Sequence, residues 1–174
     1  MNLHTQILKE HSRANCDTIV NWVGHSQERF DKLFDIFLRG DHRMNQRAAW
    51  PLCNAVIQHP GLVKKHFPKL LENLQKPGIH DAVKRNSLRL MQDMEIPRRY
   101  HGTVMNYCFD CIISPTEKVA AKAFALTILE NLSKHYPEIK SELQIVIEER
   151  WKYETAAFHS RAKKILQRLK KTTA

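Results

Sequence analysis

The chain has 174 residues, of which 43% are hydrophobic and 26% are charged. This apolar fraction is too high for a disordered chain, and the length suits one ordinary domain. The five glycines are scattered singly, which excludes the Gly-rich phosphate loops of P-loop and dinucleotide-binding proteins.

Residues 1–40 predict a helix pair that diverges from the rest of the chain. Phe30, Leu33, Phe34 and Phe37 follow the three- and four-residue spacing of an amphipathic helix. Residues 1–10 are polar and mixed, unlike a basic start followed by an apolar run. No uninterrupted apolar stretch approaches the ~18 residues of a membrane span. We therefore expect no export signal and no membrane partner.

Prolines divide the remaining chain at a regular interval. Pro60, Pro97 and Pro137 each fall between two helical patterns. A three-part pattern recurs four times: an apolar residue, a polar residue three positions later, and a small residue directly after it. A small residue at a fixed position lets two helices approach closely. The four sets are Met44, Arg47 and Ala48; Val83, Asn86 and Ser87; Val119, Lys122 and Ala123; and Phe158, Arg161 and Ala162. A period of about 38 residues is typical of helical solenoids.

Turn and cap residues place the boundaries of these units. Ser26 and Asp41 mark helix starts, and Ser114-Pro115-Thr116-Glu117 has the pattern of a capping box, which predicts a helix from residue 115. Alternating β-branched runs and hairpin turn signals are missing, so we expect no strands. The sequence predicts helix pairs at 41–76, 79–113 and 115–152, followed by a basic capping helix at 155–171.

These units resemble HEAT or armadillo-type repeats. The string Asp81-Ala82-Val83-Lys84-Arg85 is similar to the Asp-x-Val-Arg-like start of the second helix of a HEAT repeat. Asp41 stands three residues before Met44, whereas Asp81 stands two before Val83, so a regular Asp-Arg ladder is not expected. The resemblance covers about residues 40–171. It implies an all-α fold, a right-handed α-α superhelix of about four to five HEAT-like helix pairs, forming a single domain over residues 1–174.

Basic residues concentrate at the end of the chain. The net charge is +10, and residues 155–174 contain six basic residues and no acidic one. Four of the six repeat at spacings of 3, 4 and 3 along one helical face, and a second basic group lies earlier in the chain. The candidate binding residues are Arg161, Lys164, Arg168 and Lys171, and Lys84, Arg85, Arg98 and Arg99. A solvated terminal cap and a functional binding face both remain open for the first group.

The sequence contains no constellation that indicates catalysis or metal binding. Cys108 and Cys111 form a CxxC, but a zinc site needs a second ligand pair, so we interpret them as buried packing residues. No Gly-x-Ser-x-Gly elbow is present. We expect no catalytic residue, no metal and no cofactor. Trp22, Trp50 and Trp151 are interpreted as packing residues rather than as a base-stacking platform.

The resemblance and the charge together predict a non-catalytic protein-protein interaction scaffold whose partner has an acidic surface. The alternative is a nucleic-acid-binding HEAT-like protein, similar in fold and basicity to HEAT-like DNA alkylation-repair glycosylases. Four sparse cysteines suit a reducing compartment, and the cytoplasm is the expected location.

Overall fold

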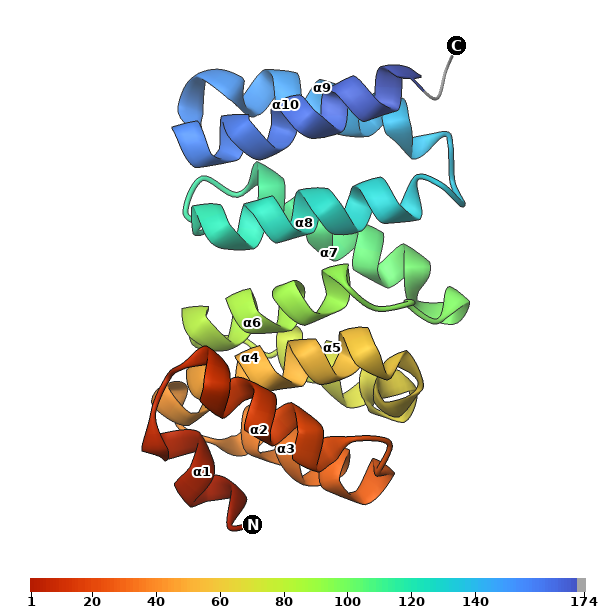
Figure 1. Cartoon of the computed structure of the whole chain (residues 1–174). Helices are drawn as coiled ribbons and strands as arrows, with labels where there is room; N and C mark the ends of the chain where they lie inside the picture. The colour runs from red at the N-terminus through yellow and green to blue at the C-terminus, as the bar shows by residue number, and fades with distance from the viewer. Residues whose placement is uncertain (172–174) are drawn as a thin grey trace. The chain divides into compact units, whose positions relative to one another are not determined.

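A computed structural model describes residues 1–171, and strands are absent from this range (Figure 1). The α-helices are α1 (Leu3–Lys9), α2 (Arg13–Val23), α3 (Gln27–Arg39), α4 (His42–Gln58), α5 (Phe67–Leu74), α6 (Asp81–Gln92), α7 (His101–Ile113), α8 (Val119–Leu132), α9 (Ile139–Arg150) and α10 (Ala156–Lys171). Short 3₁₀ segments are η1 (Pro60–His66), η2 (Arg98–Tyr100) and η3 (Trp151–Tyr153). The prediction of an all-α chain is confirmed.

The chain divides into two compact units. Unit 1 is Met1–Pro97 and contains α1 to α6 with η1, and unit 2 begins at Arg98 and contains α7 to α10 with η2 and η3. Each unit has its own apolar core, so each is described by itself.

The core of unit 1 forms around α4. This helix packs against α1, α2, α3 and α6. Phe30, Leu33, Phe34 and Phe37 of α3 are almost completely buried, as the apolar spacing predicted. Burying each of these large side chains stabilises the fold by about 1.5–3 kcal/mol. Unit 1 is therefore held together by one apolar stripe per helix facing a shared centre.

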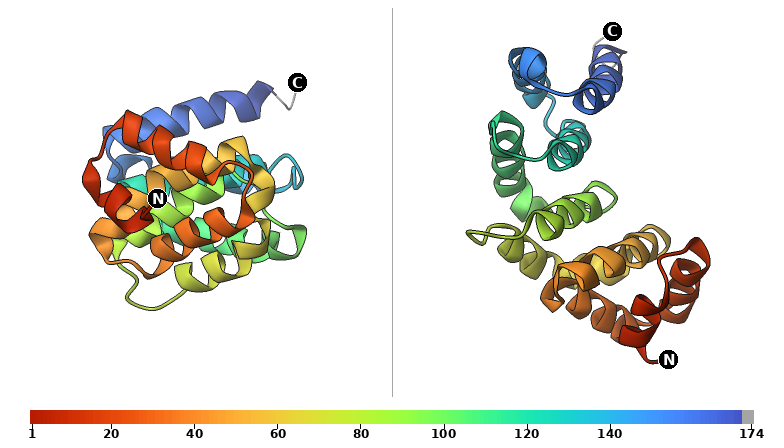
Figure 2. Two further views of the ribbon diagram at one scale, coloured as in Figure 1. Left: turned by 60° about the horizontal axis from the view of Figure 1, so that its bottom comes forward. Right: turned by 90° about the vertical axis from the view of Figure 1, so that its left-hand side faces the viewer.

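Unit 2 has two layers of helices. Figure 2 shows α7 and α9 in one layer and α8 and α10 in the other. The helices α7 and α8 pack closely, and α10 lies along α8. Ile112, Leu126, Leu143 and Phe158 contribute one fully buried side chain from each of the four helices. The layers thus meet at a core to which every helix contributes.

The recurring sequence column falls on alternate helices, α4, α6, α8 and α10. Ala48, Ser87 and Ala162 have no exposed surface, and α4 packs along α6 while α8 packs along α10. Ala123 is half-buried, and its neighbours Ala121 and Ala125 occupy the buried positions of α8. The predicted period is confirmed, and small residues stand where helices of one layer approach.

The predicted capping box at residue 114 is wrong. Ser114 instead ends α7, because its backbone N–H donates to the carbonyl of Asp110 at 3.0 Å. The following helix begins five residues after Ser114, at Val119, with Lys118 as its N-cap. Ser26 and Asp41 do cap α3 and α4, accepting from backbone N–H groups at 3.3 and 2.8 Å. Ser114 therefore caps the end of α7 with its backbone N–H, while its hydroxyl is bonded to Thr116 Oγ1 at 3.2 Å.

Candidate binding surfaces

The predicted basic row lies on α10, beside α8. Phe158, Ala162, Ile165 and Leu169 bury the opposite side of α10 in the core of unit 2. This burial leaves Arg161 and Arg168 at the edge that α10 shares with α8. Lys164 is exposed, and the side chain of Lys171 lies outside the described residues.

Two arginines of this row are held by α8. Arg161 Nη1 donates to Thr127 Oγ1 at 3.0 Å. Arg168 Nε and Nη2 donate to the two carboxylate oxygens of Glu130 at 2.5 and 2.8 Å, and this hydrogen bond raises the pKa of Arg168 above its usual value. We name the five residues the α8–α10 face: Thr127, Glu130, Arg161, Lys164 and Arg168. Its charge is mixed, and its arginines are already fixed in position.

The second predicted basic group is split between the units. Lys84 and Arg85 are half-buried on α6 of unit 1. Arg98 and Arg99 are exposed on η2 of unit 2, and the Arg99 guanidinium lies 4.8 Å from the centre of the Tyr100 ring. Lys84 and Arg85 therefore belong to unit 1, and Arg98 and Arg99 belong to unit 2.

An exposed tyrosine on η3 was missed by the sequence-based prediction. Tyr153 is 64% exposed. The Arg150 guanidinium lies 5.3 Å from the centre of its ring, and the Lys152 ammonium lies 4.8 Å from it. The signal was present in the sequence as an alternation of cation and aromatic ring over residues 150–153, Arg-Trp-Lys-Tyr.

A second aromatic ring lies in the same segment. Trp151 is half-buried rather than in the core, and the His159 ring stacks on it at 4.2 Å with an angle of 14°. His159 Nε2 donates to the Trp151 carbonyl at 2.8 Å, which fixes the stack. The Lys163 ammonium lies 6.0 Å from the Trp151 ring centre. We call the following six residues the η3–α10 surface: Arg150, Trp151, Lys152, Tyr153, His159 and Lys163.

The exposed charge of this segment has one sign. From Arg150 to Lys170 there are seven basic residues and one acidic residue, Glu154. The Glu154 side chain is 6% exposed and is bonded to Lys122 at 2.5 Å and to Arg150 at 3.0 Å. A shallow hollow of about 520 Å³ on α10 is lined by neutral and basic side chains only. The lining residues are Ala156, His159, Ser160, Lys163, Lys164 and Gln167.

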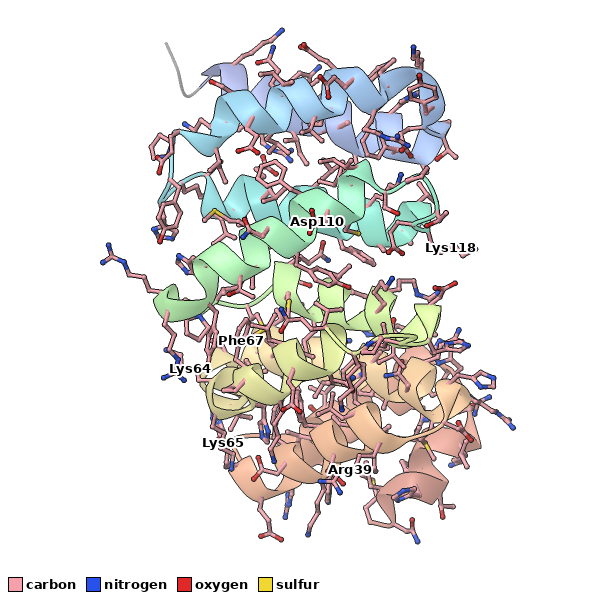
Figure 3. The ribbon with its side chains drawn as sticks, turned by 180° about the vertical axis from the view of Figure 1, so that it is seen from behind. Arg39, Lys64, Lys65, Phe67, Asp110 and Lys118 are labelled. Atoms are coloured by element: carbon pink, nitrogen blue, oxygen red, sulfur yellow. The ribbon has the colours of Figure 1, made fainter. Side chains whose placement is uncertain are left out.

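Unit 1 contains a larger hollow with mixed charge. It measures about 1170 Å³ and is bordered by α1, α3, η1 and α5. On its wall, Asp31 of α3 accepts from Lys65 Nζ and His66 Nε2 at 2.6 Å and from Gln27 Nε2 at 2.8 Å. Figure 3 shows Lys64 and Lys65 of η1 at the edge of the unit. These bonds fasten η1 to α3.

The hydrogen bonds to Asp31 favour its ionised form. Burial acts to raise its pKa, but the hydrogen bonds from Lys65, Gln27 and His66 outweigh burial and lower the pKa to about 2. His66 is 9% exposed and stacks on Phe34 at 4.2 Å. We interpret the group as a structural clasp, because Lys65 and His66 of η1 bind Asp31 of α3, and both elements belong to one unit.

The cysteines are buried, as predicted for Cys108 and Cys111. These two side chains of α7 are 0% and 5% exposed. Burial raises the pKa of the Cys108 thiol well above its usual value and that of Cys53 to about 12. Within residues 1–171, no group of three or more His, Cys, Asp or Glu side chains is arranged to hold a metal ion.

Comparisons with known proteins identify one family. A family model described as a HEAT repeat domain matches residues 3–169. The comparisons with curated proteins and with solved structures give no match. Across the described part of the chain, no helix has the length and apolar character needed to cross a bilayer.

Proposed function

We propose, since the chain belongs to the HEAT repeat family, that it is a non-catalytic scaffold that binds another protein through the α8–α10 face. The partner presents an acidic surface to Arg161, Lys164 and Arg168. The observation that carries this proposal is the fixing of Arg161 by Thr127 and of Arg168 by Glu130.

Fixed arginines suit a protein interface for two reasons. Side chains that are ordered before binding lose little conformational entropy when a partner docks. Arginine is also enriched among the residues that dominate binding energy at protein interfaces. Glu130 removes part of the positive charge, so the face suits a mixed acidic protein surface better than a uniform polyanion. Carboxylates of the partner would pair with Lys164 and with the remaining donors of the two arginines.

Affinity capture with matched variants tests this proposal. The variant Arg161→Gln/Lys164→Gln/Arg168→Gln removes three charges from the α8–α10 face. The control Lys9→Gln/Lys69→Gln/Lys76→Gln removes the same charge from exposed positions in unit 1. The full chain and both variants are immobilised, and lysate of the native host is passed over each, once untreated and once treated with nuclease. We expect acidic proteins on the wild type and the control that are missing from the α10 variant.

Two outcomes would contradict the proposal. Equal capture by all three proteins would show that the α8–α10 face does not bind the partner. Capture that disappears on nuclease treatment would show that nucleic acid bridges the proteins. Far-ultraviolet circular dichroism of each variant verifies that the helical fold is retained, as expected because Phe158, Ile165 and Leu169 still bury α10.

A further inference from the structure

We propose that the η3–α10 surface is a binding site for single-stranded nucleic acid, with Tyr153 as the ring on which an unpaired base stacks. This inference goes beyond the proposed function, because it concerns a different surface of unit 2 and a different class of ligand. It rests on an exposed aromatic ring, a second ordered ring and cations without exposed carboxylates in one short segment.

Tyr153 provides the stacking surface. Tyr153 as a residue is 64% exposed, so its side chain leaves apolar area in water that a nucleobase would cover. Base-aromatic stacking is the contact by which proteins bind single strands with little sequence preference. The Arg150 guanidinium, 5.3 Å from the Tyr153 ring, is tied to Glu154 at 3.0 Å and so stays beside the ring. Tyr153 therefore has an ordered cation beside its ring.

Lysines beside the ring provide contacts for the phosphates. Lys152 and Lys163 are exposed and lie against the Tyr153 and Trp151 rings. Lys163 also lines the hollow on α10, where no acidic side chain competes for it. The one carboxylate of the segment, on Glu154, is buried and already paired. A phosphate backbone would meet positive charge along this whole segment.

The aromatic ring distinguishes a nucleic acid from an acidic peptide. The face of an aromatic ring carries the negative part of its quadrupole, so it attracts cations and repels carboxylates. An acidic peptide could pair with Lys152 and Lys163 but would leave the Tyr153 ring uncovered. A single strand uses both features, since it has phosphates for the lysines and base faces for the ring. Base faces are hidden inside a duplex, which favours the single strand.

Fluorescence anisotropy of a labelled 15-nucleotide oligothymidylate, titrated with the full chain, tests the proposal. We expect micromolar affinity that weakens with salt. Tyr153→Leu should weaken binding by about 5- to 150-fold, which corresponds to the loss of one stacked base, whereas Tyr153→Phe keeps the ring and the affinity. Lys152→Gln/Lys163→Gln should reduce the slope of log affinity against log salt by about 1.4, because each single-strand phosphate contact contributes about 0.7.

Controls separate stacking from simple charge attraction. Lys69→Gln/Lys76→Gln removes the same charge from exposed positions of unit 1, and we expect it to leave the affinity within about twofold because neither lysine belongs to the η3–α10 surface. Unlabelled poly-glutamate and a 15-base-pair duplex serve as competitors, and both should compete poorly. The proposal is overturned if Tyr153→Leu binds as wild type, if poly-glutamate or the duplex competes equally well, or if no binding is detected. Nuclease-treated protein capture, described above, succeeds or fails independently of these results.

Discussion

Glu154 is the buried carboxylate of an ion-pair group near the end of unit 2. Its carboxylate accepts from Lys122 Nζ at 2.5 Å and from Arg150 Nη2 at 3.0 Å, and the Lys122 side chain is 2% exposed. Two cations and one carboxylate therefore share a site with little exposure to water, which joins Lys122 of α8 to Arg150 at the end of α9 through Glu154, the residue after η3. A buried charge without its partner costs several kcal/mol, so the three residues must be present together.

We predict that Glu154→Gln lowers the free energy of unfolding by about 3–5 kcal/mol, because it leaves Lys122 buried without its carboxylate. Lys122→Met/Glu154→Gln removes the buried ammonium as well and should recover much of this loss. Urea denaturation followed by circular dichroism measures both effects. Equal destabilisation of the single and double variants would contradict the assignment of the loss to the unpaired charge.

At the scale of elements, η1 depends on polar contacts with α3. Lys65 and His66 of η1 both donate to Asp31, and Gln27 of α3 donates to Asp31 and to the Leu62 carbonyl of η1 at 2.9 Å. A seven-residue 3₁₀ segment has poorer hydrogen-bond geometry than an α-helix. The side-chain hydrogen bonds of the clasp therefore help to hold η1 in its conformation.

This clasp predicts a pH dependence of stability. The pKa of Asp31 is lowered to about 2 in the folded chain, so its contribution is complete above the unfolded pKa of about 3.9 and is lost as pH falls toward 2. Asp31→Asn should be less stable than wild type at pH 6 by about 1 kcal/mol, a value reduced for partial exposure, and the difference should shrink at pH 2.5. Urea denaturation at both pH values measures it.

The control for this prediction is Asp35→Asn on the same helix. The Asp35 carboxylate pairs with Arg39 at 2.7 Å but is 57% exposed, so we expect a smaller loss of stability at pH 6. A difference between wild type and Asp31→Asn that persists unchanged at pH 2.5 would show that the clasp does not depend on the ionised carboxylate.

At the scale of the whole molecule, the reactivity of the four cysteine thiols depends on how each unit packs. Cys16 and Cys53 lie in the core of unit 1, and Cys108 and Cys111 lie in the core of unit 2. Burial raises the pKa of Cys16, Cys53 and Cys108, which lowers the fraction of reactive thiolate. Each unit thus contains two thiols that become reactive only when that unit opens.

We predict that Ellman's reagent modifies none of the four thiols of the native chain within minutes and all four in denaturant. Mass spectrometry at intermediate urea should show Cys16 modified together with Cys53, and Cys108 together with Cys111, because each pair shares one compact unit. Ser160→Cys, at an exposed position of α10, is the positive control for the reagent. Rapid modification of two or more native thiols would contradict the buried placement.

The sequence by itself determined the fold class and much of the repeat pattern. Apolar residues three and four apart define a helix face wherever they occur, and Ser26 and Asp41 act on backbone groups only three residues away. Ser114 marks the limit of this local reasoning. Its pattern suits the start of one helix, but the preceding helix ends at the same residue, and only the folded chain decides between them.

Only the tertiary structure decided what the charged and aromatic side chains do. Arg168 is paired with Glu130, which lies 38 residues earlier, and Lys122 is paired with Glu154, which lies 32 residues later. Periodicity places a residue on a helix face but does not say which neighbouring helix covers that face. The exposure of Tyr153 and the partial neutralisation of the α10 row follow from that packing, because the environment of a side chain is set by residues distant in the sequence.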